Sequence, residues 1–250
     1  MKKIERVKGD RKVSVNVSFM QLYNEKIYDL LNREMFKGRK KSVIGEGLKL
    51  KWNKFDVYTV ENLLTVEIDE VEEVLHLFHY GIRNKILGSH KMNMTSSRSH
   101  TIFTITVEQI PIDNPDNTIV SKLQIVDLAG SERQNLTGSD GRMQKEAIEI
   151  NKSLFTLRKV ISALTDRNKD GGYGNDAVYI PYRDSKLTCL LRQSLGGNST
   201  CCMIANLHPS DSHFEENNMT LTYAAKAAQI KNSPIRNDDP QTKLINQLKG

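Results

Sequence analysis

The sequence contains little of what marks secreted, membrane-spanning or disulfide-bonded proteins. Its three cysteines, Cys189, Cys201 and Cys202, include an adjacent pair, which suits neither a disulfide framework nor a set of metal ligands. No apolar run approaches the roughly 18 residues of a membrane helix, and none follows the basic first residues as a signal peptide requires. We therefore expect a cytoplasmic protein without a membrane partner, whose thiols are reduced and mostly buried.

The positive charge is concentrated near the start of the chain and identifies no partner by itself. The net charge is +6, but residues 1–54 hold 15 Lys and Arg against 6 Asp and Glu, so the rest of the chain is slightly negative. Such a basic segment is compatible with nucleic acid or another acidic polymer. A nucleic-acid-binding domain is the weakest hypothesis, because the sequence lacks the aromatic stacking platform that such modules use.

Strand-like and helix-like patterns alternate along the chain, which predicts a single α/β domain with a layered architecture. The predicted strands cover residues 13–19, 56–64, 100–109, 122–128 and 201–207, the last of them buried. The predicted helices cover residues 25–31, 69–82, 150–164, 185–195 and 215–231, with another beginning near residue 241.

A hydroxyl-rich segment around a single arginine lies between a predicted helix and a predicted strand. It runs Asn93-Met94-Thr95-Ser96-Ser97-Arg98-Ser99-His100. Hydroxyl oxygens are suitable ligands for Mg²⁺, and an arginine pairs with carboxylates or phosphates. On composition alone, however, a loop of this kind is more often an ordinary turn.

A second segment, Leu123-Gln124-Ile125-Val126-Asp127-Leu128-Ala129-Gly130-Ser131-Glu132, is an apolar strand that ends in Asp127. In a nucleotidase, such an aspartate holds the metal through water, and a nearby glycine lets a backbone N–H reach the terminal phosphate. The pattern is weak by itself, because many strands end in aspartate and glycine merely to turn.

Together the two segments resemble the kinesin motor domain, the first its switch I (N-x-x-S-S-R-S-H) and the second its switch II (D-L-A-G-S-E). The similarity continues in family order through four further stretches, over residues 13–232. They are Val17–Leu31, Lys145–Ala147 together with Ile150–Leu154, Tyr182–Thr188 and Ser194–Asn198. The resemblance implies a three-layer, P-loop NTPase-like motor core with a central mixed sheet, which binds ATP and Mg²⁺ and associates with microtubules of the cytoskeleton.

The resemblance also implies a role for each residue of the site. Ser97 touches Mg²⁺, which Asp127 holds through water, and Ser99 lies with them at the cofactor. Asn93 and Ser96 position the attacking water and the switch loop. Arg98 pairs with Glu132 to close the site, and the Gly130 amide senses the γ-phosphate. The chemistry is phosphoryl transfer to water, in which positioning and electrostatics supply most of the catalysis.

Microtubule binding is implied for a different set of basic residues that occupy tubulin-facing positions of the family. They are Arg133, Arg142, Lys145, Lys152, Arg183 and Lys186. Without the resemblance, these residues read equally well as a solvated face. Charges interact over roughly 10 Å at moderate salt, so the local positive charge matters more than the total.

One motif of the family is absent: no G-x-x-x-x-G-K-[ST] phosphate-binding loop occurs in the sequence. We therefore expect an N-terminally incomplete motor core, and two functions remain open. The first is part of a microtubule-stimulated ATPase motor, and the second is a microtubule-binding module without hydrolysis. The expected parts are a basic segment at 1–12, a partial motor domain at 13–232, and a neck linker with the start of a stalk at 233–250, through which the full-length protein could dimerise.

Overall fold

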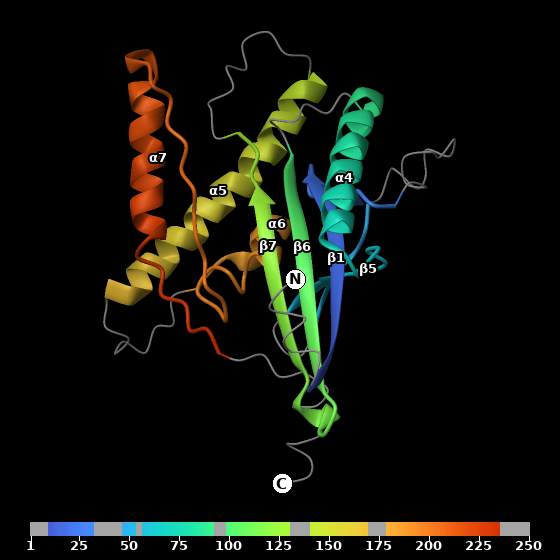
Figure 1. Cartoon of the computed structure of the whole chain (residues 1–250). Coiled ribbons are helices and arrows are strands. Elements are labelled where there is room, and N and C mark those ends of the chain that lie inside the picture. The colour runs from blue at the N-terminus through green and yellow to red at the C-terminus, as the bar shows by residue number, and fades with distance from the viewer. Residues whose placement is uncertain are drawn as a thin grey trace. The chain divides into compact units, whose positions relative to one another are not determined.

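The computed structural model describes residues 10–32, 47–53, 57–92, 99–130, 141–169 and 179–235 (Figure 1). These residues fall into two compact units. The first contains the main sheet and helix α4 (Val71–Met92), and the second contains helices α5 (Gly141–Lys169), α6 (Lys186–Leu190) and α7 (Phe214–Ala227). Each unit is described by itself. Among the described residues, no helix combines the length and apolarity needed to cross a membrane.

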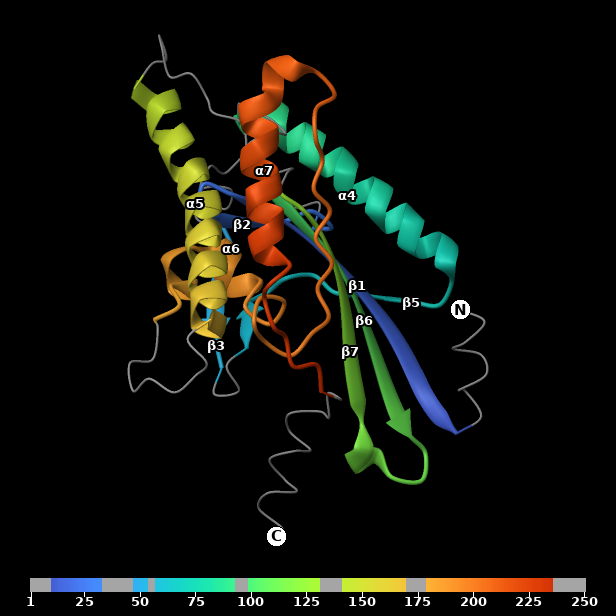
Figure 2. The same cartoon turned by 90° about the vertical axis from the view of Figure 1, so that its left-hand side faces the viewer.

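The first unit is built on an antiparallel sheet with the strand order β2-β1-β6-β7, in which β5 also pairs with β1 (Figures 1 and 2). Its strands are β1 (Arg11–Tyr23), β2 (Lys26–Asp29), β5 (Val66–Ile68), β6 (His100–Pro111) and β7 (Ile119–Asp127). The short strands β3 (Leu50–Trp52) and β4 (Tyr58–Val60) lie outside this sheet. The described strands of the sheet pair with one another only in antiparallel fashion. The parallel pairs of the expected mixed sheet are therefore not found among the described strands.

Helix α4 covers one face of the sheet, and an aromatic cluster joins the two. Phe78 of α4 stacks on Phe19 of β1, with ring centroids 5.7 Å apart, and both rings meet Phe103 of β6 edge-on. The helix starts where the Glu73 carboxylate accepts hydrogen bonds from the backbone N–H groups of Asp69 and Glu70, at 2.9 and 3.3 Å. These bonds lower the pKa of Glu73 and satisfy donors that a helix start leaves open.

The predicted helix over residues 25–31 is wrong, because this segment is strand β2 in a hairpin with β1. Asn24 and Glu25 form the two-residue turn, with φ values of +48° and +54°. Two successive residues with positive φ match the twist of a tight hairpin, and asparagine tolerates this conformation better than most residues. The apolar residues of the segment, including Ile27, therefore enter the sheet core instead of lining a helix.

In the second unit, α5 presents a continuous buried stripe to its neighbours. Leu157, Val160, Ile161 and Leu164 are at most 2% exposed, as the predicted helical periodicity requires. The Thr165 hydroxyl donates to the carbonyl oxygen of Ile161, at 2.8 Å, and lies 3.3 Å from that of Lys226 at the end of α7. Helices α5 and α7 therefore pack together, and both confirm predicted elements.

The predicted buried strand over residues 201–207 is wrong. The segment forms neither a strand nor a helix, and Ile204 is 81% and Leu207 47% exposed. Cys201 and Cys202 are also exposed, so of the three free thiols only Cys189 is buried as expected. An alternating apolar segment is buried only when a neighbouring strand and a covering layer are present, and no described strand pairs with this one.

The carboxylate of Asp29 gives the first testable prediction. It is fully buried at the end of β2 and accepts hydrogen bonds from the backbone N–H groups of Leu31, Asn32 and Leu64, at 2.9, 3.2 and 2.6 Å. Burial raises its pKa, while the three bonds oppose that rise. We expect Asp29→Ala to lower the free energy of unfolding by on the order of 3 kcal/mol, because three backbone donors, one buried and two half-buried, lose their acceptor.

Urea denaturation checks this expectation. The matched control is Asp113→Ala, which removes an exposed carboxylate from the same unit and is expected to stay within about 0.5 kcal/mol of the parent chain. Equal denaturation midpoints for the two variants would contradict the structural role of Asp29.

Candidate functional site

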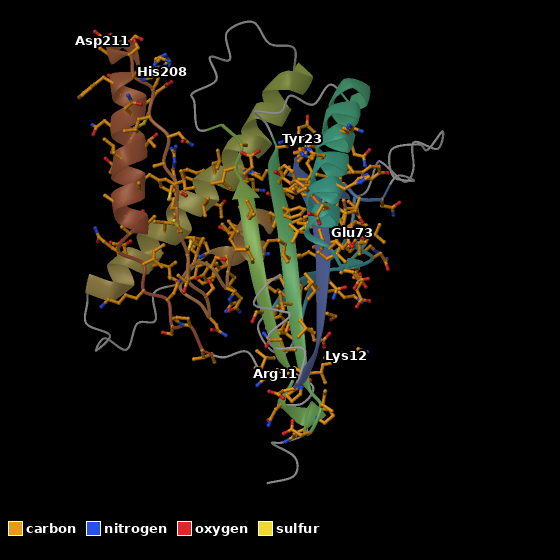
Figure 3. All side chains as sticks on the ribbon, in the orientation of Figure 1. Arg11, Lys12, Tyr23, Glu73, His208 and Asp211 are labelled. Atoms are coloured by element: carbon orange, nitrogen blue, oxygen red, sulfur yellow. The ribbon has the colours of Figure 1, made fainter. Side chains whose placement is uncertain are left out.

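The register of the sheet places the end of the first motif, at His100, beside the Asp127 of the second motif at one end of the first unit. Leu22 lies opposite His100 in the β1–β6 pair, and Thr101 lies opposite Asp127 in the β6–β7 pair. The start of β6 and the end of β7 are therefore neighbours. In Figure 3, Tyr23 marks this end of β1, whereas Arg11 and Lys12 lie at the opposite end.

Asp127 forms an ion pair with a lysine from helix α4. The Nζ atom of Lys85 lies 3.3 Å from Oδ2 of Asp127. The lysine side chain is 11% exposed and that of the aspartate 72%, so the carboxylate is open to solvent while its partner is nearly enclosed. The pair holds the carboxylate at the sheet edge and leaves its second oxygen accessible to a ligand.

His100 links the start of β6 to the segment that follows β7. Its Nδ1 atom accepts a hydrogen bond from the backbone N–H of Ala129, at 2.9 Å, so the ring is neutral with its proton on Nε2. Burial lowers the pKa of His100 to about 4; the Asp127 carboxylate opposes this shift and the Lys85 cation adds to it. The residue after Ala129 is Gly130, so the imidazole fixes the backbone beside the predicted phosphate sensor.

Ser99 is the one hydroxyl residue of the hydroxyl-rich segment that lies in the described part of the chain, and its side chain is buried. It is 1% exposed, and its hydroxyl oxygen has no hydrogen-bond partner among the described residues. A buried hydroxyl without a partner is costly unless a ligand or another group satisfies it. Together with the open carboxylate of Asp127, it fits the switch side of a Mg²⁺-nucleotide site. Within the described residues, no cluster of three or more His, Cys, Asp or Glu side chains could hold a metal alone.

The structure describes some of the predicted site residues and not others. Those of the nucleotide site that fall outside the described residues are Asn93, Ser96, Ser97, Arg98 and Glu132. Asp127 and Ser99 belong to the first unit, and Gly130 begins the second.

For the predicted microtubule-binding residues, Arg133 also lies outside the described residues. The side chains of Arg142 and Lys145 do too, although their backbone belongs to α5. Lys152 and Arg183 are exposed and Lys186 is half-buried. These three come from α5, from the short helix η3 (Tyr182–Asp184) and from α6, all in the second unit. Their partner stays a prediction.

Sequence reasoning missed two contributions to this site. The sequence around Lys85 contains no pattern that indicates a functional residue. Lys85 lies 42 residues from Asp127, and only the packing of α4 on the sheet brings the two together. His100 was noted as the last residue of a motif, but its bond to Ala129 depends on the β6–β7 register.

Comparison with known proteins decides the family. The family model described as the kinesin motor domain matches residues 1–230. The chain belongs to the kinesin motor domain family. Kinesin-related protein 1 of Dictyostelium discoideum is 45% identical over 237 residues, which are 94% of this chain and 10% of that protein. Chromosome-associated kinesin KIF4A of Homo sapiens is 44% identical over 244 residues, which are 97% of this chain and 18% of that protein.

Solved kinesin structures confirm the α/β fold class. A fast kinesin superposes with a TM-score of 0.77 at 36% identity, over 92% of this chain and 60% of its own. The KIF14 dimer, solved with AMP-PNP in complex with a microtubule, superposes with a TM-score of 0.82 at 36% identity, over 99% of this chain and 66% of its own. The kinesin chain described here thus spans about two thirds or less of these solved chains and under a fifth of the two curated relatives named.

The neutral, buried state of His100 predicts a pH dependence of stability in this kinesin chain. Its pKa in the folded state is about 4, below its ordinary value of 6.5, so unfolding takes up a proton between these values. Stability is therefore lost as the pH falls from 6.5 towards 4. We expect His100 to account for about 2.5 kcal/mol of lost stability between pH 7.5 and pH 4.5.

The variant His100→Asn keeps a hydrogen-bond acceptor near the position of Nδ1 but cannot titrate. Urea denaturation at both pH values should show a smaller loss for this variant than for the parent, by about the same 2.5 kcal/mol. His79→Asn changes an exposed histidine of α4 and should lose stability as the parent does. Parallel pH profiles for the parent and His100→Asn would contradict the assignment.

Proposed function

We propose that this chain is part of a microtubule-based motor, in which ATP binding and hydrolysis are coupled to microtubule binding and movement. The observation that carries the proposal is the match to the kinesin motor domain over residues 1–230. The KIF14 structure, which covers 99% of this chain, was solved on a microtubule with a nucleotide analogue. We therefore propose microtubules as the partner, ATP as the nucleotide and the cytoplasmic cytoskeleton as the location.

In the proposed reaction, Ser97 would hold Mg²⁺ directly and Asp127 would hold it through water. The metal supplies charge neutralisation for the phosphates when it is bound. Asn93 and Ser96 orient the attacking water, and Arg98 pairs with Glu132 to close the site. The described residues support the aspartate's role, because its carboxylate is open to solvent at a strand end and is oriented by Lys85.

His100 supports the proposed role of Gly130 in sensing the γ-phosphate. The His100 imidazole accepts a hydrogen bond from the Ala129 N–H at 2.9 Å, so the backbone beside Gly130 is tied to strand β6. A backbone N–H that hydrogen-bonds a phosphate oxygen must be held in a defined position, because small displacements abolish the hydrogen bond. The residues of this chain thereby orient both the metal-binding carboxylate and the sensing segment.

The second candidate is a microtubule-binding module without hydrolysis, since the given sequence contains no G-x-x-x-x-G-K-[ST] motif. The two functions differ in ATP turnover. Hydrolysis is measured for the chain alone and for the chain joined behind a segment that carries the motif, together with co-sedimentation on microtubules. The motor function predicts microtubule binding by both proteins and turnover by the second. Binding without turnover by either supports the module, and no binding by either contradicts both.

The boundaries within the chain stay part of this proposal. Residues 1–12 form a basic segment, residues 13–232 the motor portion, and residues 233–250 a neck linker that leads into a stalk. The described part of the last segment supports its position after the core, because the backbone N–H of Ser233 donates to the carbonyl of Gly197 at 3.0 Å. A stalk that follows this segment is the proposed route to a dimer.

A further inference from the structure

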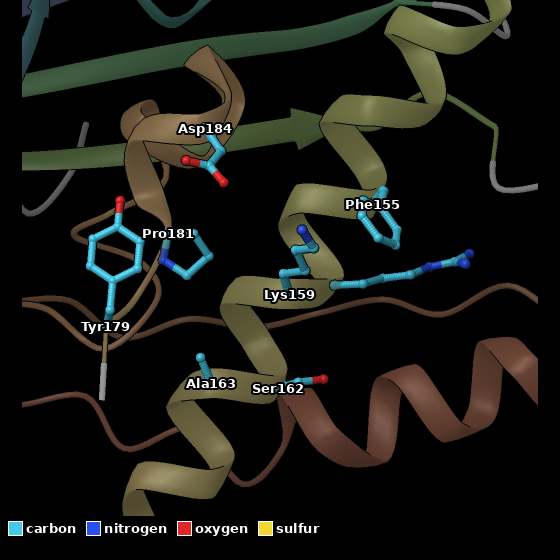
Figure 4. A pocket seen from close by; sticks show the side chains of 8 residues that line it. Phe155, Lys159, Ser162, Ala163, Tyr179, Pro181 and Asp184 are labelled. Carbon is cyan, nitrogen blue, oxygen red and sulfur yellow. The ribbon is translucent and has the colours of Figure 1, made fainter. Parts of the chain in front are cut away.

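A shallow depression of about 630 Å³ in the second unit lies beside an exposed phenylalanine (Figure 4). Phe155, Arg158 and Lys159 line it from helix α5. Tyr179, Pro181 and Asp184 line it from the segment that leads into and includes η3. Phe155 is 57% and Tyr179 71% exposed, so two aromatic rings lie open to solvent at one small hollow.

The position of Phe155 on α5 explains why the fold does not bury it. The buried stripe runs through Leu157, Val160, Ile161 and Leu164, and at 100° per residue Phe155 points to the opposite side of the helix. Lys159 follows one turn later on the same side. A phenylalanine on the side opposite the core leaves more than half of its apolar surface in water.

Lys159 holds this ring. Its Nζ atom lies 4.7 Å from the centroid of the Phe155 ring, in cation–π geometry. The spacing i, i+4 brings the two side chains together on a helix surface. An exposed cation–π pair is worth roughly 0.5–1 kcal/mol and gains strength when water is removed. The Phe155–Lys159 interaction would therefore be stronger beneath a bound partner than on the solvent-exposed surface.

The charges around the depression favour an acidic partner. Two of its lining residues, Arg158 and Lys159, are cations, and one, Asp184, is an acid. Lys152, one turn before Phe155 on the same side of α5, adds a further exposed cation. A scattered exposed apolar residue is ordinary in proteins. An aromatic ring bordered by cations and beside a hollow matches the composition of binding hot spots, where aromatics and arginine dominate.

We propose that Phe155 is the apolar anchor of the contact with the acidic microtubule surface, and that Lys159 and Arg158 surround it with positive charge. This inference rests on the proposed function. It adds Phe155 to the basic residues of the proposed interface as the residue that makes the apolar contact. The partner's surface is expected to present carboxylates to the two cations and an apolar side chain to the ring. Binding then removes water from the Phe155–Lys159 pair.

The test is co-sedimentation of the 250-residue chain with stabilised microtubules over a series of salt concentrations. Phe155→Ser is expected to raise the Kd at least tenfold without changing its salt dependence, because no charge is lost. Lys159→Ala is expected to raise the Kd and also to make it less dependent on salt. The double variant is expected to lose less binding free energy than the sum of the losses of the two single variants, because the two residues are in contact.

Two controls separate binding from folding. Phe155→Tyr keeps the ring and should bind like the parent. Leu75→Ser removes a comparably exposed apolar residue (55%) from α4 in the first unit and should bind like the parent as well. Since both sites are exposed, thermal unfolding of the variants should match that of the parent.

The outcomes separate this inference from the proposed function. A parent chain that does not sediment with microtubules contradicts both. A parent chain that sediments while Phe155→Ser binds within twofold of it contradicts the anchor alone. If the substitution weakens binding to duplex DNA but leaves microtubule binding unchanged, the hollow serves a nucleic acid and the inference is overturned.

Discussion

Reversing two basic residues of the second unit, with Lys152→Glu and Arg183→Glu together, is expected to weaken microtubule binding at least 30-fold. Lys152 lies on α5 and Arg183 in η3, and both side chains are exposed. If these residues contact the acidic partner as proposed, the two reversed charges replace attraction by repulsion. A 30-fold change corresponds to about 2 kcal/mol, or about 1 kcal/mol for each site. Co-sedimentation at low and moderate salt measures the effect, which should shrink as salt increases.

The matched control reverses the same amount of charge elsewhere. Lys12→Glu and Lys122→Glu change two exposed lysines of the sheet, and each pair of reversals takes the net charge from +6 to +2. If binding followed the total charge, both double variants would weaken equally. We expect the control variant to bind microtubules less than threefold more weakly than the parent. Equal losses would show that binding follows the total charge and is not specific to the α5 and η3 surface.

The spacing of apolar residues predicted most helices and strands correctly, because in these segments the side of the element that is apolar in the sequence is also the side that is buried in the fold. The alternation in Val13–Phe19 became the centre of β1, and the apolar spacing that begins near residue 71 became α4. Where the two disagree, the pattern failed. Residues 25–31 hold apolar residues at spacings that suit a helix as well as a strand, and the turn at Asn24 decided for the strand.

Burial was harder to predict than secondary structure, because it depends on what lies next to an element. Leu123 and Ile125 alternate correctly for a buried strand, yet they are 57% and 56% exposed on β7. Among the described strands β7 pairs only with β6, and α4 packs on β1 and β5. The segment 201–207 fails in the same way. In both places the apolar pattern is present, and no described strand pairs along the uncovered side of the segment.

The candidate site shows the same division between local and distant information. Asp127 and Gly130 were predicted from one short segment, since a strand that ends in aspartate is visible in sequence. Lys85 and the acceptor role of His100 were not, because each contact joins elements that only the tertiary structure brings together. Motifs therefore identified the residues expected to touch a ligand and missed those that hold them in place.

Gly81→Ala is expected to lower the free energy of unfolding by about 3 kcal/mol, and Gly81→Leu to prevent the sheet and α4 from packing. A Cβ atom built on Gly81 would lie 2.2 Å from Cδ1 of Phe19 and 2.7 Å from Cε1, far inside contact distance. In an exposed helix the same change to alanine stabilises by about 1 kcal/mol. The expected effect has the opposite sign, because the glycine lets α4 approach the aromatic cluster, and overpacking of a full core is costly.

Urea denaturation with a double-variant cycle checks this argument. Phe19→Leu removes the ring that the new methyl group meets, so Gly81→Ala should cost at least 1 kcal/mol less in that background than in the parent. His79→Ala, at an exposed position two residues earlier on the same helix, should change stability by less than about 0.5 kcal/mol. If Gly81→Ala raised the denaturation midpoint, helix propensity would outweigh the contact, and the close approach of α4 to β1 at Phe19 would be wrong.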